Sequence, residues 1–389
     1  MRIVFVGPFG LSPKRTMAAR ALPLAQALTR RGHTVVMLLP PWSNPVAAGT
    51  SSDECGVRVV NLPLPPRIPV LFHFWLTLAL LHRALALQPD VIHCFKPKAY
   101  AGLVAWCIWQ LKRLGVTRTR LVVDADDWEG AGGWNDVERY TWPLKKFFAW
   151  QERWGLTHAD AITVASRALQ TIVWSLGVPR TRVLCVPNGV SVPDHATTRP
   201  RDHPTTRPSL LLYTRFFEFD LSRVARLFAR IGAQHPSLRF VVLGTGFFGE
   251  EQQFAQLLDA SGMRERVTWL SWPPPDGLAA TFARATLAVY PFDDTLLNRT
   301  KCAVKLTELL NAGVPVVAEA VGQNAEYIAH GESGLLVRAG DADAFVAAVT
   351  QLLNDDDLRA RIGDGARRRM ADHFAWDKLV REVERAYGA

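Results

Sequence analysis

Cysteine is scarce and scattered in this sequence of 389 residues. The five cysteines show neither CxxC spacing nor a nearby pair of histidines at zinc-ligand spacing, which argues against a disulfide scaffold and a structural zinc site. The first ten residues carry one Arg and a short apolar run that ends in Gly-Pro-Phe-Gly, without a small-residue cleavage site. We therefore expect a reduced, cytoplasmic protein.

No apolar run is long enough to cross a bilayer. The most apolar segment, Val70 to Leu81, ends at His82 and Arg83 after too few residues. Two interpretations of this segment stay open: a buried helix that covers a sheet, or a helix that lies on a membrane surface beside basic residues. These basic neighbours are Lys112, Arg113, Arg118, Arg120, Lys145 and Lys146.

Acidic residues are sparse in the first half of the chain. The net charge is +9, with 22 basic and 11 acidic residues through Val190 and 23 and 25 after it. Ten of the 13 Trp residues also lie in that first half, where they serve either as ordinary core or as contacts to sugar faces and lipid headgroups. This half is expected to face something anionic, such as a phospholipid surface or a phosphorylated substrate. No motif supports nucleic acid as a partner.

What the sequence does have is an alternation of apolar strand-like runs with helical patterns, once on each side of a Pro-rich segment. Runs that are apolar throughout predict parallel sheets covered on both faces. We predict an α/β fold of two tandem doubly wound, Rossmann-like domains that face each other across a cleft. The domains are residues 1–192 and 209–373, the linker is 193–208, and a last helix, 374–389, packs back on the first domain.

Two glycine-rich loops follow predicted strands. Gly7 to Gly10, before Lys14, Arg15 and a helix expected over Thr16 to Arg31, is a loop that an anion can approach, or simply a tight turn. The spacing of Gly244, Gly246 and Gly249 matches a dinucleotide fingerprint, but the acid expected about 20 residues later is missing. We therefore expect the amides of Gly244 to Gly246 to face the cleft without a nicotinamide or flavin.

A third segment combines cations with a carboxylate. A helix is expected to begin near Cys302, with Lys301 and Lys305 close to its N-terminus and Glu308 one turn beyond. This arrangement suits a diphosphate and two sugar hydroxyls, although a surface Lys–Glu pair would give the same spacing.

Acidic residues cluster after the strand predicted over Arg120 to Ala125. Asp124, Asp126, Asp127 and Glu129 are able to orient an acceptor hydroxyl, accept its proton, bind a divalent cation, or simply cap a helix. The following Gly132-Gly133-Trp134-Asn135 suggests a flexible acceptor loop with a stacking indole.

Together these pieces resemble the GT-B glycosyltransferases of the retaining family 4 group. The resemblance spans the whole chain in the expected order. It rests on the Gly7–Gly10 loop, LTRRGHTVVML, VPNGV at 186–190, KLTELLNAGVPVVAEAVG, Glu326 in NAEYI, HGESGLLVRAGD, and FAWDKLVREVERAY.

The resemblance implies roles for individual residues. Arg215 would contact the donor diphosphate, Glu308 the ribose, and the Ala303 and Val304 amides the phosphate, while Gly10 would approach the donor from the first domain. It also implies a metal-independent site. The chain departs from the family at three positions. Thr300 stands where the first glutamate of a pair is usual, and Asp220 stands where a lysine is usual, so that Lys301, Lys305 or Arg223 would supply the cation. Asp126 stands in place of a histidine.

We therefore expect a retaining glycosyltransferase that moves a sugar from a nucleotide diphosphate-sugar to a sugar, polysaccharide or lipid-linked acceptor, working in the cytoplasm or at the inner membrane face. No metal and no cofactor are expected beyond the nucleotide-sugar co-substrate. Alternatives are a GT-B-like nucleotide-sugar-binding protein with impaired catalysis, and a sugar-nucleotide epimerase. Catalytic residues are Asp126, Arg215 and Lys301; donor-binding residues are Gly10, Arg215, Gly244, Gly246, Lys301, Ala303, Val304, Lys305 and Glu308; acceptor-side residues are Asp124, Asp127 and Trp134.

Overall fold

The computed structural model describes residues 1–13, 16–68, 70–191 and 207–389. The contacts within the chain divide it into two compact units. Unit 1 is Met1–Ser191, Thr300–Cys302 and Trp376–Ala389, and unit 2 is Val192–Arg299 and Ala303–Ala375. Lys14, Arg15 and all but the last two residues of the expected linker 193–208 lie outside the described residues.

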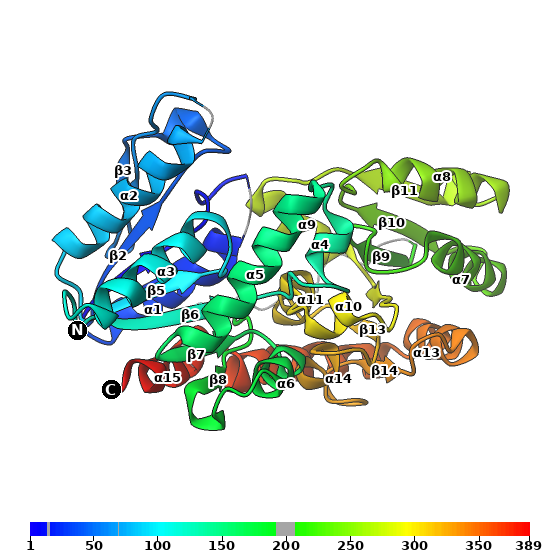
Figure 1. Ribbon diagram of the computed structural model, residues 1–389. Helices are drawn as coiled ribbons and strands as arrows, with labels where there is room; N and C mark the ends of the chain where they lie inside the picture. Colours follow the sequence, from blue (N-terminus) through cyan, green and yellow to red (C-terminus); the bar gives the residue numbers. More distant parts are fainter. Residues whose placement is uncertain (14–15, 69, 192–206) are drawn as a thin grey trace. The chain divides into compact units, whose positions relative to one another are not determined.

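Unit 1 is built on a sheet with eight strands in the described residues, in the order β3-β4-β2-β1-β5-β6-β7-β8 (Figure 1). The strands are β1 (Arg2–Val6), β2 (Thr34–Leu39), β3 (Ser51–Glu54), β4 (Val57–Asn61), β5 (Val91–Phe95), β6 (Arg120–Ala125), β7 (Ala161–Val164) and β8 (Val183–Cys185). Only β3 with β4 is antiparallel among the strand pairs of this described sheet. Strand order reverses between β1 and β5, the switch point at which such sheets usually bind ligands.

Helices cover both faces of this sheet. They are η1 (Met17–Ala21), α1 (Leu22–Arg30), η2 (Pro45–Ala47), α2 (Leu71–Ala86), α3 (Ala99–Arg113), α4 (Trp134–Val137), α5 (Trp142–His158), α6 (Arg167–Ser175), η3 (Arg180–Arg182) and α15 (Trp376–Tyr387). Side chains alternate along β1, so Ile3 and Phe5 pack with α1 and α15, while Val4 and Val6 pack with α2 and α3. Within the described part of the chain, no helix combines the length and the apolar character that crossing a bilayer requires.

Unit 2 is built on a parallel sheet with six strands in the described residues, in the order β11-β10-β9-β12-β13-β14. The strands are β9 (Ser209–Tyr213), β10 (Arg239–Leu243), β11 (Val267–Leu270), β12 (Leu287–Tyr290), β13 (Val316–Glu319) and β14 (Leu335–Val337). Strand order reverses between β9 and β12, which places the second switch point at the end of β9.

The helices of unit 2 are α7 (Leu221–Gln234), α8 (Glu250–Ala260), η4 (Arg264–Arg266), α9 (Pro275–Arg284), α10 (Leu296–Thr300), α11 (Val304–Asn311), α12 (Asn324–Tyr327), α13 (Ala342–Asn354) and α14 (Asp356–His373). The last residue of α10 groups with unit 1. One apolar cluster joins α7, α8, α13 and α14 to the sheet, as in Phe228 against Phe240 with ring centroids 4.8 Å apart.

The predicted fold class, two doubly wound parallel-sheet domains, is confirmed by these two sheets. Two local predictions were confirmed. The helix expected over Thr16 to Arg31 is present as the π-helical η1 followed by α1, and the helix expected near Cys302 begins at Val304. The edge strand β3 was not predicted, because its Ser-Ser-Asp-Glu sequence has little β-propensity. A tight turn at Cys55-Gly56, both with positive φ, pairs it with β4.

Candidate functional site

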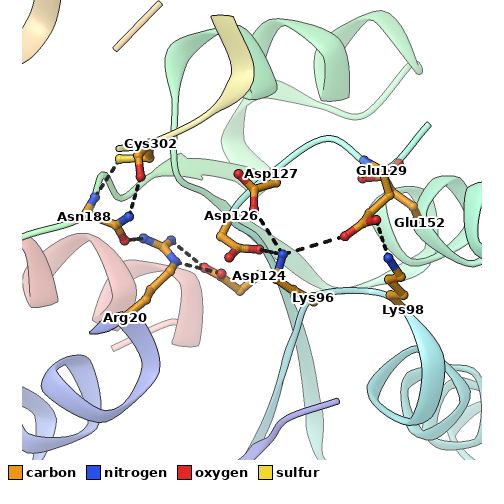
Figure 2. A network of polar contacts seen from close by, with 10 residues as sticks. All are labelled: Arg20, Lys96, Lys98, Asp124, Asp126, Asp127, Glu129, Glu152, Asn188 and Cys302. Atoms are coloured by element: carbon orange, nitrogen blue, oxygen red, sulfur yellow. Dashed lines mark hydrogen bonds and ion pairs between the residues drawn. The ribbon is translucent and has the colours of Figure 1, made fainter. Parts of the chain in front are cut away.

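In unit 1 the carboxyl ends of β5 and β6 lie side by side, with Phe95 paired to Asp124. The chain beyond β5 turns sharply at Lys96, whose φ of 55° is unusual for a residue with a side chain and whose amide donates to the Asp124 carbonyl at 2.9 Å. This turn directs the Lys96 side chain toward the acids that follow β6 (Figure 2). Strain of this kind often marks a functional site.

Lys96 is the centre of a cluster of carboxylates. Its Nζ lies 3.0 Å from Asp126 Oδ1, 3.1 Å from Asp127 Oδ2 and 3.7 Å from Glu129 Oε1. Burial disfavours its charge, but these three acids more than offset that and raise the pKa of Lys96 well above its usual value. Lys96 is therefore a permanent cation that holds three carboxylates together.

Asp126 is the buried member of this cluster that titrates near neutral pH. Burial raises its pKa to about 6, since neighbouring Asp127 and Asp124 add to the desolvation while Lys96 opposes it. Above about pH 6 it is a carboxylate able to accept a hydrogen bond from a hydroxyl.

A second lysine extends the cluster. Lys98 Nζ lies 2.6 Å from Glu129 Oε2, and the Glu129 amide donates to Glu152 Oε1 at 2.9 Å. Burial, with Glu129 nearby, raises the pKa of Glu152 well above the usual range. The loop after β6 is thus anchored by ion pairs to Lys96 and Lys98, which follow β5, and by a hydrogen bond to Glu152 on α5.

Asp124, unlike the acids around Lys96, is ion-paired with an arginine inside unit 1. Arg20 donates to both of its carboxylate oxygens, at 2.9 and 2.7 Å, and the Thr163 hydroxyl donates at 2.6 Å. Burial alone would raise the pKa of Asp124, but Arg20 more than offsets it and the pKa is lowered. Arg20 and Asp124 are each 1% exposed, so this expected acceptor-side residue is an internal ion pair.

The hydrogen bonds around Asp124 determine the state of a buried histidine. Because Thr163 donates to a carboxylate, its oxygen is left to accept from His93 Nε2 at 3.1 Å, and His93 Nδ1 then accepts from the Tyr387 hydroxyl at 2.8 Å. Burial lowers the pKa of His93 to about 4, so the ring is neutral. This chain of bonds ties α15 to the sheet of unit 1.

Trp134 begins the short helix α4, and the loop before it, which we expected to be a flexible acceptor loop, is closed by hydrogen bonds. Its amide donates to the Trp128 carbonyl at 2.9 Å, and the Gly132 amide donates to Asp136 Oδ2 at 2.7 Å. Nearby, Asn135 donates to the Lys145 carbonyl at 2.9 Å. The backbone of Trp134 is therefore fixed against the loop that carries the acid cluster, and its side chain is half-buried.

Gly10 ends the loop after β1. A Cβ there would lie 3.5 Å from the Pro41 Cβ, which is ordinary contact, so packing within unit 1 does not require a glycine at this position. Gly7 differs, since a Cβ would come within 2.7 Å of Leu39. Lys301 and Cys302 also group with unit 1, where Asn188 donates to the Cys302 carbonyl at 2.8 Å.

In unit 2 the expected donor residues gather at the switch point. Arg215 follows β9, and its guanidinium carbon lies 4.3 Å from the ring centroid of Trp272 and 5.3 Å from that of Phe247. Trp272 is held in turn by a 2.9 Å bond from its indole nitrogen to the Thr245 hydroxyl. Cation–π stacking of this kind orients a guanidinium while leaving its N–H groups directed to the side.

Lys305 is paired with Glu218, which the sequence analysis missed. Lys305 Nζ lies 2.6 Å from Glu218 Oε1, and Glu218 Oε2 accepts from the Thr214 hydroxyl at 3.0 Å and the Arg215 amide at 3.1 Å. Glu218 thereby connects the cation on α11 to the loop that carries Arg215. The position of Glu218 three residues after Arg215 is the sequence feature from which its role could have been predicted.

The other donor residues lie around the same strand ends. Glu308 Oε2 accepts from the Tyr213 hydroxyl at 2.9 Å, so it lies against the end of β9. Ala303 and Val304 form the N-cap and first residue of α11, where backbone amides and the helix dipole favour an anion.

Gly244 and Gly246 follow β10. Gly244 has a φ of 120°, and a Cβ there would lie 2.2 Å from the Thr214 carbonyl oxygen, so only glycine fits beside the Arg215 loop. The Gly246 amide donates to Glu251 Oε2 at 2.8 Å.

Arg223, one of our alternatives for the donor cation, is held by carboxylates in this structure. It is ion-paired with Asp293 at 2.7 Å and makes two bonds, of 2.8 and 3.0 Å, to the fully buried Glu319. Among the residues that the structure describes, no group of three or more His, Cys, Asp or Glu side chains is arranged to hold a metal ion.

Two family models match the chain. Residues 15–189 match the glycosyl transferase 4-like domain, and residues 197–369 match the glycosyl transferases group 1 model.

Curated relatives match over part of their length. The chain is 28% identical over 230 residues to an exopolysaccharide phosphotransferase of Streptomyces coelicolor, covering 59% of this chain and 23% of that protein. It is 32% identical over 155 residues to a D-inositol 3-phosphate glycosyltransferase of Corynebacterium aurimucosum, covering 39% and 35%. The chain thus spans about a quarter to a third of these relatives.

Solved structures match over their whole length. The sucrose-phosphate synthase of Thermosynechococcus elongatus has a TM-score of 0.74 at 19% identity and covers 100% of this chain and 98% of its own. HepE of Anabaena, solved with UDP and glucose, has a TM-score of 0.69 at 16% identity and covers 100% of both chains. At these identities the likeness shows the fold.

Proposed function

We propose a function from the premise that this chain belongs to the group 1 glycosyltransferases and has their GT-B fold. In this proposal the protein transfers a sugar from a nucleotide diphosphate-sugar to an acceptor hydroxyl. The observation that supports this most is the cluster at the switch point of unit 2. There a guanidinium, an ammonium and a carboxylate converge from β9 and α11, beside the N-terminus of a helix. These are the groups that a diphosphate and a ribose require.

In this proposal Arg215 and Lys305 neutralise the charge that develops on the leaving diphosphate, and Glu308 accepts hydrogen bonds from the ribose. The Ala303 and Val304 amides at the start of α11 contact the phosphate, with the Gly244 to Gly246 backbone alongside. Glu218 is a positioning residue, since it holds Lys305 and the Arg215 backbone together. Gly10 and Lys301 belong to unit 1, and their contacts with the donor remain expectations from the sequence.

We further propose that the anomeric configuration is retained. The bond from the anomeric carbon to the phosphate oxygen breaks while the acceptor oxygen bonds to the same face, and the acceptor proton passes to a phosphate oxygen of the leaving group. Asp126 orients that acceptor, with Asp127 and Trp134 beside it. Asp124 is left out of the acceptor contacts, because Arg20 and Thr163 occupy both of its oxygens.

The acceptor that we propose is a sugar, a polysaccharide or a lipid-linked glycan of the cell envelope, reached at the inner membrane face. Support comes from the relative that is named for exopolysaccharide and from the charge and Trp content of the first half of the chain. Neither a metal nor a further cofactor has a step in this proposal.

Thermal shift against UDP-, GDP-, ADP- and TDP-sugars tests the donor site, since a ligand that binds the native state raises the melting temperature. One nucleotide is expected to stabilise the wild type but neither Arg215→Ala nor Glu308→Ala. Matched controls are Arg226→Ala and Glu265→Ala, exposed residues of the same types in unit 2. A shift that persists in both site variants would contradict the assignment.

The second candidate is a nucleotide-sugar-binding protein with impaired catalysis, favoured by Thr300 and Asp126 at positions where the family carries Glu and His. Binding without either product or donor hydrolysis, across a panel of acceptors, would select it over the transferase.

A further inference from the structure

Helix α2 exposes apolar side chains where a helix on a protein surface normally carries polar ones. Its inner face, with Leu76, Leu80 and Ala84, is buried against the sheet. Its outer face carries Leu71, Phe74, Trp75 and Leu78 at helical spacing, and the two aromatic residues are 54% and 56% exposed. A helix that is apolar all round is usually enclosed by protein or lipid.

The same pattern continues on α5. Trp142, Phe147 and Trp150 are all exposed on it, and Trp142 and Trp150 are 70% and 46% exposed. Phe147 stacks on Trp150 with ring centroids 5.8 Å apart. Since α2, α3 and α5 cover one face of the unit 1 sheet, their outer sides point away from it together (Figure 1).

The charge on these three helices has one sign. Their basic residues are Arg83, Lys112, Arg113, Lys145, Lys146 and Arg153, and their single acidic residue, Glu152, is fully buried. Asp160, next to α5, is paired with Lys112. Lys146 lies over the Trp142 ring at 5.7 Å, so a cation and an exposed indole occur at one place.

We infer that the outer side of α2, α3 and α5 docks on an anionic lipid bilayer surface. Indole and phenyl side chains partition into the headgroup boundary, and lysine and arginine beside them are attracted to anionic lipids. This inference adds a binding surface to the membrane location given under the proposed function. It rests on the proposed function only for the identity of the membrane, because lipid binding itself does not require sugar transfer. The uniform basic charge of this surface favours anionic lipid over a protein partner or a second copy of the chain.

Flotation of the full chain with vesicles of 30% phosphatidylglycerol in phosphatidylcholine tests the surface at low salt. We expect the wild type to float and binding to pure phosphatidylcholine to be weaker. Phe74→Ser/Trp75→Ser should bind about a hundredfold more weakly, since burying each such side chain is worth about a decade in affinity. The matched control is Trp269→Ser, an exposed tryptophan on β11 of unit 2, which should bind as the wild type does.

A second pair of variants separates charge from apolar contact. Lys145→Gln/Lys146→Gln should lower binding to the anionic vesicles but not the weak binding to neutral ones, whereas Arg226→Gln/Arg361→Gln, exposed in unit 2, should change neither. Thermal melts of each variant show that it is folded.

The inference is overturned if the wild type does not float at low salt, or if Phe74→Ser/Trp75→Ser floats equally well. An oligomer that this double variant dissociates, without lipid binding, would assign the surface to a second copy instead. Donor-induced thermal shifts on the same samples distinguish a failure of this inference from a failure of the proposed function. Lipid binding without a donor response would contradict only the proposed function.

Discussion

At the carboxyl ends of β5 and β6 in unit 1, carboxylates outnumber cations. Asp124, Asp126, Asp127, Glu129 and Glu152 surround Arg20, Lys96 and Lys98. At the switch point of unit 2, Arg215 and Lys305 meet two carboxylates, Glu218 and Glu308. The first half of the chain is nevertheless the basic one, with 22 basic residues against 11 acidic.

The charge at the strand ends of unit 1 is thus unlike that of the first half of the chain as a whole, whereas in unit 2 the two signs are balanced at the site. Because the interior of unit 1 is rich in acids, its positive excess must lie elsewhere, and α2, α3 and α5 carry part of it on their outer side. The net charge therefore describes the outer surface of this protein, whereas the buried side chains at the strand ends determine what each unit can bind.

The buried pair in unit 1 should show the largest effect. Arg20→Met leaves the Asp124 carboxylate without its main partner inside the protein, so we expect the free energy of unfolding to fall by about 3–5 kcal/mol. Arg30→Met, which removes an exposed pair with Asp377, should cost less than about 1 kcal/mol. Urea unfolding measures both, and equal losses would show that the Asp124 site is not a closed ion pair.

The partly buried cation of unit 2, Arg215, should matter for the reaction and little for stability. Arg215→Ala should lower kcat/KM by about 10²–10³ because it removes stabilisation of the leaving diphosphate, while the urea midpoint stays near that of the wild type. Arg215→Lys should recover only part, since lysine lacks the planar fork that stacks on Trp272. Full recovery by lysine would mean that only charge matters there.

A pH profile distinguishes the acid cluster of unit 1 from the donor side. Because the pKa of Asp126 is raised to about 6, its carboxylate is lost as pH falls through that value, and kcat should drop about tenfold per pH unit below it. Asp126→Asn should be slow at every pH and lack this limb. An unchanged limb in Asp126→Asn would assign the titration to another group.

The smallest effect is expected at the aromatic clamp. Trp272→Ala should weaken donor binding by about 1 kcal/mol, through loss of the contact to Arg215, and Trp272→Phe should keep most of it. Isothermal titration with the donor measures the difference. Equal affinity in the alanine variant would show that the ring does not orient the guanidinium.

Periodicity and motif spacing predicted much of the fold and part of the site. The apolar runs identified the parallel strands. Spacing singled out Lys305 and Glu308, the family resemblance added Arg215, and the structure places all three around the switch point of unit 2. The sequence analysis missed Arg20, Lys96, Lys98 and Glu218, although Lys96 and Lys98 alternate directly after a predicted strand. It also left the side of the Val70 to Leu81 helix open, because periodicity does not show which face remains uncovered.

The sequence by itself determined the alternation of strands and helices in each unit and led us to expect a diphosphate near Arg215 and Lys305, because these inferences depend on neighbours along the chain. Only the tertiary structure decided the state of each charge. Arg20 and Asp124 are 104 residues apart, and Lys305 and Glu218 are 87 apart, so their pairing exists only once the sheets have formed. Burial and proximity then set the pKa of Asp126 and leave the aromatic side of α2 exposed to solvent.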